Sequence, residues 1–137
     1  MNRNIKPKEG YGDIRLGMPV EEVVAILGEP SSVENMLDAM DEPLTILSYQ
    51  EESISLFFEG ENPILNCIDI CNDDATLFDE DIFDMNEEEI LFLMQKQGYK
   101  DVEIEDEDWG ERSISFPSCN VDFYFEDSEL LSVEIGR

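Results

Sequence analysis

Two parts of the chain resemble each other at a spacing of 67 positions, and this self-similarity limits the possible folds more than any other feature. The apolar pattern that follows Met18 returns after Met85. The same spacing aligns "SISLFFEG" at 53–60 with "NVDFYFED" at 120–127, which pairs Ile54 with Val121, Leu56 with Phe123 and Phe58 with Phe125. A fixed internal period indicates one supersecondary unit that is used twice.

Each unit is predicted to contain one helix followed by antiparallel strands. The first helix should carry Val20, Val23, Val24 and Leu27 on one face, because they recur at helical spacing. We expect a single α+β domain over 1–137, made of two tandem helix–β-meander repeats at about 11–78 and 79–137, with an antiparallel sheet and the helices on one face. The predicted strands lie near 44–49, 53–58 and 64–71, then near 101–105, 112–116, 120–126 and 130–135, with a weak tendency around Val33.

Local signals mark where the helices begin and end. Pro19 suits the first turn of one helix, and Gly28 should end it. In the second helix, Asn86 is the predicted N-cap and Glu89 its partner in a capping box, while Gly98 is a C-terminal signal.

The segment "IRLGMPVEEVVAILGEP" at 14–30 resembles the signature of a known group of proteins. Its motif residues are Leu16, Gly17, Met18, Glu22, Val23, Leu27, Gly28 and Pro30. They are similar to the motif that opens the helix-plus-sheet repeats of the beta-lactamase inhibitor protein family and of the small lipoprotein of the outer-membrane assembly machine. The resemblance implies a sheet with helices on one face. The other face of the sheet and its hairpin loops would be available to bind a protein.

Charge is the strongest guide to the class of partner. The chain has 35 acidic and 8 basic residues, and the 80 residues from Leu16 to Gln95 hold 21 acidic residues without any Lys or Arg. Such a surface repels phosphates and anionic lipids, so we expect neither nucleic acid nor a membrane as partner. A basic protein is the natural complement, although general solubility would also account for the charge.

Few residues offer catalytic or metal-binding chemistry. The chain contains no His, which removes the most common general base and metal ligand. The acidic run at 72–89 fails the calcium-loop pattern, because Asp84 stands where Gly is required and Ile90 where Glu is required. The three cysteines, at 67, 71 and 119, are predicted to be free thiols that pack as small hydrophobes. We therefore expect no enzyme activity, no cofactor and no metal.

Strand alternation suggests which surface binds the partner. If Ile54, Leu56 and Phe58 face the helices, the intervening side chains face away, and so do those of the matching strand near 120–126. Aromatic side chains among carboxylates on an open sheet resemble the centre of an interface, where Trp and Tyr are over-represented. Alternatively, Phe57 and Tyr124 only pack on each other and Trp109 covers a sheet edge. The predicted partner-binding residues are Phe57, Glu105, Asp106, Asp108, Trp109, Asp122 and Tyr124.

These features together favour a non-catalytic binding protein. The first residues hold no apolar segment typical of a signal peptide, so we expect a cytoplasmic protein. A bacterial immunity or inhibitor protein that neutralises a basic partner, such as a toxin nuclease, fits the charge and the size. A scaffold or assembly module and a DNA mimic are the alternatives.

Overall fold

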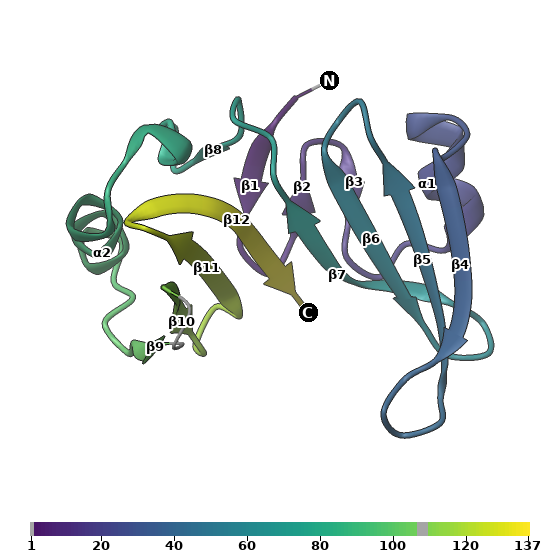
Figure 1. Cartoon of the computed structure of the whole chain (residues 1–137). Coiled ribbons are helices and arrows are strands. Elements are labelled where there is room, and N and C mark those ends of the chain that lie inside the picture. Colours follow the sequence, from purple (N-terminus) through teal and green to yellow (C-terminus); the bar gives the residue numbers. More distant parts are fainter. Residues whose placement is uncertain (1, 107–109) are drawn as a thin grey trace.

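The computed structural model describes residues 2–106 and 110–137 and consists mainly of one large antiparallel sheet. Its eight strands lie in the order β4-β5-β6-β7-β12-β11-β10-β9, so β7 and β12 join two four-stranded parts at the centre (Figure 1). The strands are β4 (Ser32–Leu37), β5 (Pro43–Tyr49), β6 (Ile54–Glu59), β7 (Ile64–Ile70), β9 (Glu103–Asp106), β10 (Glu111–Phe116), β11 (Val121–Glu126) and β12 (Glu129–Gly136).

Two short α-helices cover one face of this sheet. The first helix, α1 (Val20–Leu27), follows Pro19 and ends at Gly28, whose φ of 85° suits glycine. The second helix, α2 (Glu87–Lys96), begins at Asn86, and the predicted capping box with Glu89 is confirmed. A short 3₁₀ helix, η1 (Ile82–Asp84), precedes α2.

A second, four-stranded sheet lies on the same side as the helices and was not expected from the sequence. It has the order β3-β2-β1-β8, with β1 (Asn4–Lys6), β2 (Gly10–Tyr11), β3 (Ile14–Arg15) and β8 (Thr76–Leu77). β1 runs parallel to β8 and antiparallel to β2. This sheet buries Ile5, Tyr11, Ile14 and Leu77, so the N-terminal segment is part of the core.

The predicted fold class, α+β with two tandem helix–β-meander repeats, is wrong. The described part of the chain has twelve strands and only two α-helices, of 8 and 10 residues, and is therefore mostly β. Two causes account for the difference. The N-terminal segment, for which no element was predicted, pairs with β8, and the segment around Val33, predicted only as a weak strand, completes the large sheet as β4. The strands that were predicted elsewhere are present within about two residues of their expected bounds.

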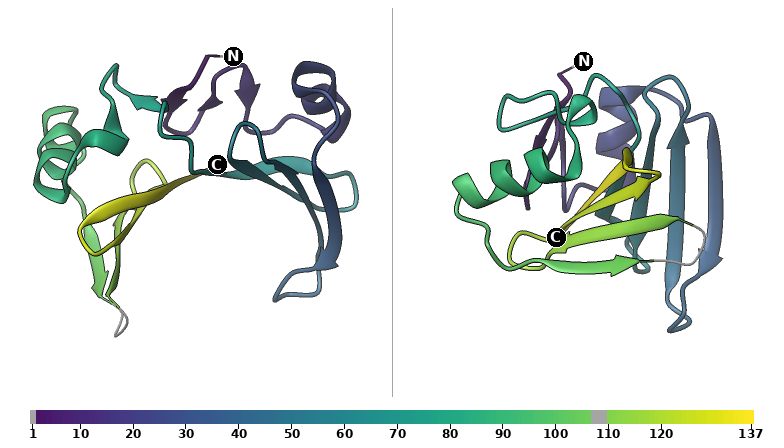
Figure 2. Two further views of the ribbon diagram at one scale, coloured as in Figure 1. Left: turned by 45° about the horizontal axis from the view of Figure 1, so that its top comes forward. Right: turned by 60° about the vertical axis from the view of Figure 1, so that its left-hand side comes forward.

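The large sheet is curved like an arch, with the helices and the small sheet on its outer side (Figure 2). The apolar side chains of alternate positions pack between these layers; in β6 they are Ile54, Leu56 and Phe58, and in β11 Val121, Phe123 and Phe125. The inner side of the arch bears no covering element among the described residues. We call this inner surface the concave face.

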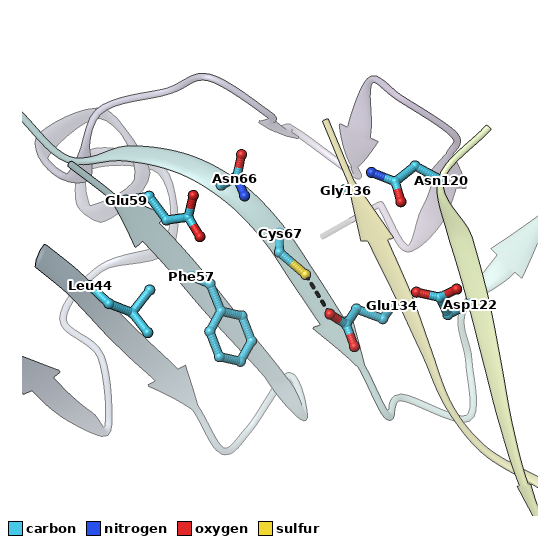
Figure 3. Close-up of a pocket in the computed structure, with 9 residues that line it drawn as sticks. All are labelled: Leu44, Phe57, Glu59, Asn66, Cys67, Asn120, Asp122, Glu134 and Gly136. Carbon is cyan, nitrogen blue, oxygen red and sulfur yellow. Dashed lines mark hydrogen bonds between the residues drawn. The ribbon is translucent and has the colours of Figure 1, made fainter. Parts of the chain in front are cut away.

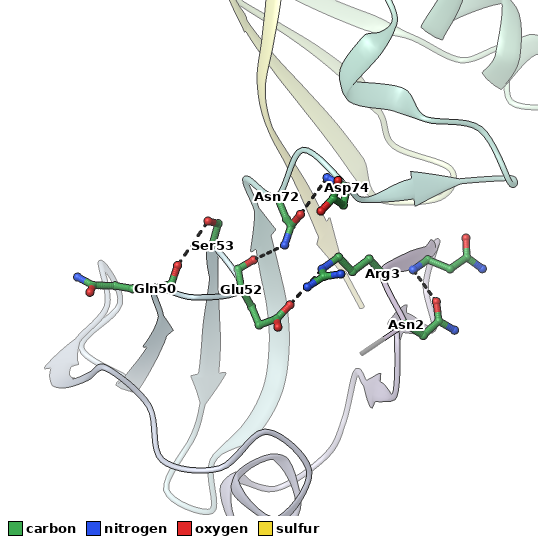
Figure 4. Close-up of polar contacts among 8 residues, drawn as sticks. Asn2, Arg3, Gln50, Glu52, Ser53, Asn72 and Asp74 are labelled. Carbon is green, nitrogen blue, oxygen red and sulfur yellow. Dashed lines mark hydrogen bonds and ion pairs between the residues drawn. The ribbon is translucent and has the colours of Figure 1, made fainter.

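Polar contacts connect the N-terminal segment to the turn between β5 and β6 (Figure 4). Arg3 Nε lies 3.3 Å from Glu52 Oε2, an ion pair that lacks hydrogen-bond geometry. The Nδ2 of Asn72 donates a hydrogen bond of 3.0 Å to the backbone oxygen of Glu52. The small sheet is thus tied to one side of the large sheet by charge as well as by packing.

A search of the described residues for a helix that is long and apolar enough to cross a membrane finds none.

Candidate binding face

Three carboxylates stand side by side in the middle of the concave face. Asp69 on β7 lies directly opposite Glu134 on β12, and Glu134 lies directly opposite Asp122 on β11. Residues in direct register on neighbouring strands have their side chains on the same face, about 5 Å apart. Like charges at this distance are unfavourable, so a cationic group placed over the row would be attracted strongly. We call these three residues the carboxylate row.

Two neutral donors from neighbouring strands hold Glu134 at the centre of the row. The thiol of Cys67 donates to Glu134 Oε1 at 2.9 Å, and the hydroxyl of Tyr124 donates to Glu134 Oε2 at 3.3 Å. Each carboxylate oxygen therefore has a partner that carries no positive charge. The negative charge of Glu134 is oriented by these bonds but is not cancelled.

Burial and mutual repulsion raise the pKa values of titratable side chains in and beside the row. Burial raises the pKa of the Cys67 thiol, and the hydrogen bond and charge of Glu134 raise it further. Burial, followed by the charges of Glu134 and Asp122, also raises the pKa of Tyr124. The pKa of Asp69 is raised by burial and by the charge of Glu134. A thiol with a raised pKa is a poor nucleophile, so the arrangement around Cys67 does not resemble a reactive cysteine.

A hollow of about 300 Å³ opens beside the carboxylate row (Figure 3). The ring of Phe57 on β6 borders it on one side, and Glu134 and Asp122 border it on the other. The hollow thus lies across the junction of β7 and β12 and combines an aromatic surface with three carboxylates, those of Glu59, Asp122 and Glu134. This combination suits an Arg or Lys side chain, whose apolar stem and charged end need different surroundings.

The structure brings three of the predicted residues together on this face. Phe57, Asp122 and Tyr124 all lie on the concave face and are half-buried. Glu105 is exposed on β9 and shares this face, because it pairs with Ser113, which in turn pairs with Tyr124. The alternation of β6 and β11 was therefore interpreted correctly, while the binding role of these residues stays a prediction.

Asp106, by contrast, does not lie on the concave face. Asp106 pairs with Arg112 on the helix-covered face, and its Oδ1 lies 2.9 Å from Arg112 Nη1. The same guanidinium contacts Glu87 of α2 at 2.9 Å. Asp106 is thus paired with an internal cation, which it shares with Glu87. Asp108 and Trp109 lie outside the described residues.

Sequence reasoning missed Cys67, Asp69 and Glu134, which form the centre of the face. The prediction that all three cysteines are buried small hydrophobes is wrong in part, since Cys71 is exposed and Cys67 hydrogen-bonds on the concave face, while Cys119 is buried. The sequence does contain a signal for two of these residues. Cys67 and Asp69 alternate with buried Ile68 and Ile70, so the rule applied to β6 would have placed them correctly.

The described residues contain no group of three or more His, Cys, Asp or Glu side chains arranged to hold a metal ion.

Comparisons with known proteins support the fold but name no family. No family model matches the chain, and no curated protein matches it. Among solved structures, the chain is similar to an extracellular protein containing a SCP domain from Bacillus anthracis str. Ames, with a TM-score of 0.50 and 14% sequence identity. The similarity covers 95% of this chain and 49% of that one, so the chain spans about half the length of that protein. At this identity the likeness concerns the fold alone.

Proposed function

We propose that the protein is a non-catalytic binding protein that holds a basic protein partner on its concave face. In this proposal it acts in the bacterial cytoplasm as an immunity or inhibitor protein that blocks a cationic partner such as a toxin nuclease. The observation that carries the proposal is the carboxylate row beside Phe57. Three carboxylates in direct register, with only neutral donors bonded to the central one, form a surface that a cationic partner would complete.

Burial and charge support binding rather than chemistry. The protonated thiol of Cys67 and the hydroxyl of Tyr124 serve as fixed donors that orient Glu134. Arg is a frequent hot-spot residue of protein interfaces, and a partner's guanidinium could contact both the ring of Phe57 and the carboxylates beside it. The net charge of −27 adds long-range attraction, which accelerates association with a basic partner and disfavours nucleic acid and anionic membranes.

The proposal is tested by capturing the partner and then removing charge from one face at a time. The immobilised wild-type protein is exposed to native lysate, and proteins that elute with salt are identified, purified and titrated against variants. We expect Asp122→Asn combined with Glu134→Gln to weaken binding about a hundredfold, because two close charge pairs are lost. The matched control, Glu21→Gln with Glu22→Gln on exposed positions of α1, removes the same charge and should change the affinity less than about threefold.

The result that overturns the proposal is an equal loss of affinity in both double variants, since net charge alone would then explain binding. Circular dichroism of each variant confirms that the fold is kept. The activity of the captured partner separates the related functions. Inhibition of a toxin on binding supports an immunity protein, whereas a partner with unchanged activity indicates an assembly module, and competition by DNA for the same partner indicates a DNA mimic.

A further inference from the structure

The two edges of the large sheet differ in how well they are protected. The edge strand β9 has four residues, of which Glu103, Glu105 and Asp106 are acidic. The other edge, β4, has six residues and one carboxylate, that of Glu34. Short length and charged side chains are the usual means by which native proteins protect a sheet edge from further pairing. By this criterion β9 is protected and β4 is not.

Strand β4 also exposes apolar side chains on both of its faces. Val33 and Leu37 lie on the helix-covered side, where Val33 pairs with the buried Leu47, and they are 54% and 61% exposed. Met36 lies on the concave side and is 44% exposed. Among the described residues, no strand pairs with the outer edge of β4, so its outward backbone groups are unpaired within the sheet.

The inner edge of β4 is firmly held, which makes the strand a preformed template. Six residues of β4 are in continuous register with β5, from Ser32 opposite Ser48 to Leu37 opposite Pro43. A side-chain hydrogen bond of 3.0 Å from Thr45 Oγ1 to Asn35 Oδ1 adds to this pairing. An extended segment could therefore add to β4 without rearrangement of the sheet.

We propose that β4 binds an extended segment of a partner as an additional strand, and that this segment alternates apolar and basic side chains. Its apolar side chains would lie beside Val33 and Leu37, and its basic side chains would lie on the face of Glu34. The charge beside β4 favours a basic segment, because Glu34 lies on the strand, the turn that follows it carries Asp38, Asp41 and Glu42, and residues 16–95 hold no Lys or Arg. The site is separate from the hollow on the concave face, and the proposal goes beyond the function proposed above.

A second copy of the chain is a poor occupant of this edge. Each copy carries a net charge of −27, and pairing of β4 with its own copy would bring both Glu34 residues and both acidic turns at 38–42 to one seam. Like charges that face each other across strands are unfavourable.

The test uses two synthetic peptides of equal composition and amide-exchange NMR of the full chain. The probe alternates four lysines with three valines, and the control peptide has the four lysines first and the three valines last. We expect the alternating peptide to slow exchange of β4 amides about tenfold and to leave β9 amides unchanged. The control peptide has the same charge but cannot present apolar and basic faces as a strand, so it should not protect β4.

Matched variants separate strand addition from general attraction. Val33→Lys adds a charge to the apolar edge and should weaken binding of the alternating peptide about tenfold. Ile104→Lys makes the same change on β9, where Ile104 also faces the helix-covered side and is 44% exposed, and should have little effect. Asp122→Asn with Glu134→Gln should leave the protection of β4 amides intact. The strand-addition proposal can therefore hold even if the concave face binds no partner.

Three outcomes would overturn the proposal. They are equal protection by both peptides, equal weakening by Val33→Lys and Ile104→Lys, and protection of β4 that appears with rising protein concentration in the absence of peptide. The last of these would identify a second copy as the occupant.

Discussion

Each half of the large sheet, together with the helix that covers it, forms one side of the molecule, and the two sides balance their charges differently. The side formed by α2 and β9–β12 has its own cation, Arg112, which joins Glu87 of the helix to Asp106 of the edge strand. The side formed by α1 and β4–β7 contains no Lys or Arg. On this side, Glu52 forms an ion pair with Arg3, which belongs to the N-terminal segment. The side formed by α1 and β4–β7 therefore leaves more of its negative charge uncompensated, at a cost to stability.

The largest expected effect tests whether the two helices are anchored alike. Val23 of α1 and Ile90 of α2 are both fully buried against the sheet. We expect Ile90→Ala to lower the free energy of unfolding by about 3 kcal/mol and Val23→Ala by about 2 kcal/mol, because each leaves a cavity in the core. Urea unfolding measures both values, and exposed Ile26→Ala on α1 serves as the control. A cost near that of the control at either site would show that this helix does not contribute to the core.

The N-terminal ends of the helices provide a second contrast. The cap of α2 is the box formed by Asn86 and Glu89, whereas Pro19 offers α1 no side-chain hydrogen bond. Asn86→Ala should lower the free energy of unfolding by about 1 kcal/mol, because an orphan backbone N–H at the helix end loses its acceptor. Asn86→Ser restores an acceptor and should recover most of the loss. If Asn86→Ser is as unstable as Asn86→Ala, the side-chain contact is not the source of the effect.

How much the sequence predicts depends on how regular each segment is. β6 and β11 alternate buried and outward residues without interruption, so their faces were placed correctly, including Phe57, Asp122 and Tyr124. β2, β3 and β8 have two residues each, which is too short for any periodic pattern. Each of them contributes one buried side chain to the core, namely Tyr11, Ile14 and Leu77. β4 is exposed on both faces and therefore lacks the alternation that marks a half-buried strand.

The candidate site shows the same limit at the level of single residues. An offset of one position decides the face on which a strand residue lies. In the acidic segment "EIEDED" at 103–108, only Ile104 marks the apolar face, and it places Asp106 on that face with Arg112 and Glu105 on the concave face. The prediction grouped the two acids by their charge and did not apply this rule. The face on which Glu134 lies could have been predicted, because it alternates with the buried Val133 and Ile135 in β12.

Salt dependence sharpens the comparison of the two sides. The melting temperature should rise between about 20 mM and 500 mM NaCl, because the screening length falls from about 20 Å to about 4 Å. Glu61→Lys, in an exposed turn on the side without cations, should raise the melting temperature at low salt and reduce the gain from salt. The matched change Glu103→Lys, on the side that has Lys96, Lys100 and Arg112, should do both to a smaller extent. Equal responses would show that the charge imbalance is shared by the whole molecule.

The smallest expected effect concerns Asp69, which lies where the two sides meet. Burial, and then the charge of Glu134, raise the pKa of Asp69 above its ordinary value of 3.8. Between that ordinary value and the raised one, the folded protein holds a proton that the unfolded chain has released. Stability contributed by this group is therefore present below pH 3.8 and is lost as the pH rises through the raised pKa. This is the reverse of the behaviour of a carboxylate that is stabilised by a cation.

Asp69→Asn removes this titration and isolates it from the other acids. The variant should gain stability relative to the wild type at neutral pH, and the gain should disappear as the pH approaches 4. Chemical unfolding at several pH values between about 4 and 7 measures the difference between the two proteins. A gain that is independent of pH would mean that Asp69 is ionised in the folded protein as easily as in the unfolded chain. A cation from a bound partner, placed over the carboxylate row, would lower the pKa of Asp69 and diminish the pH dependence, because it favours the charged form.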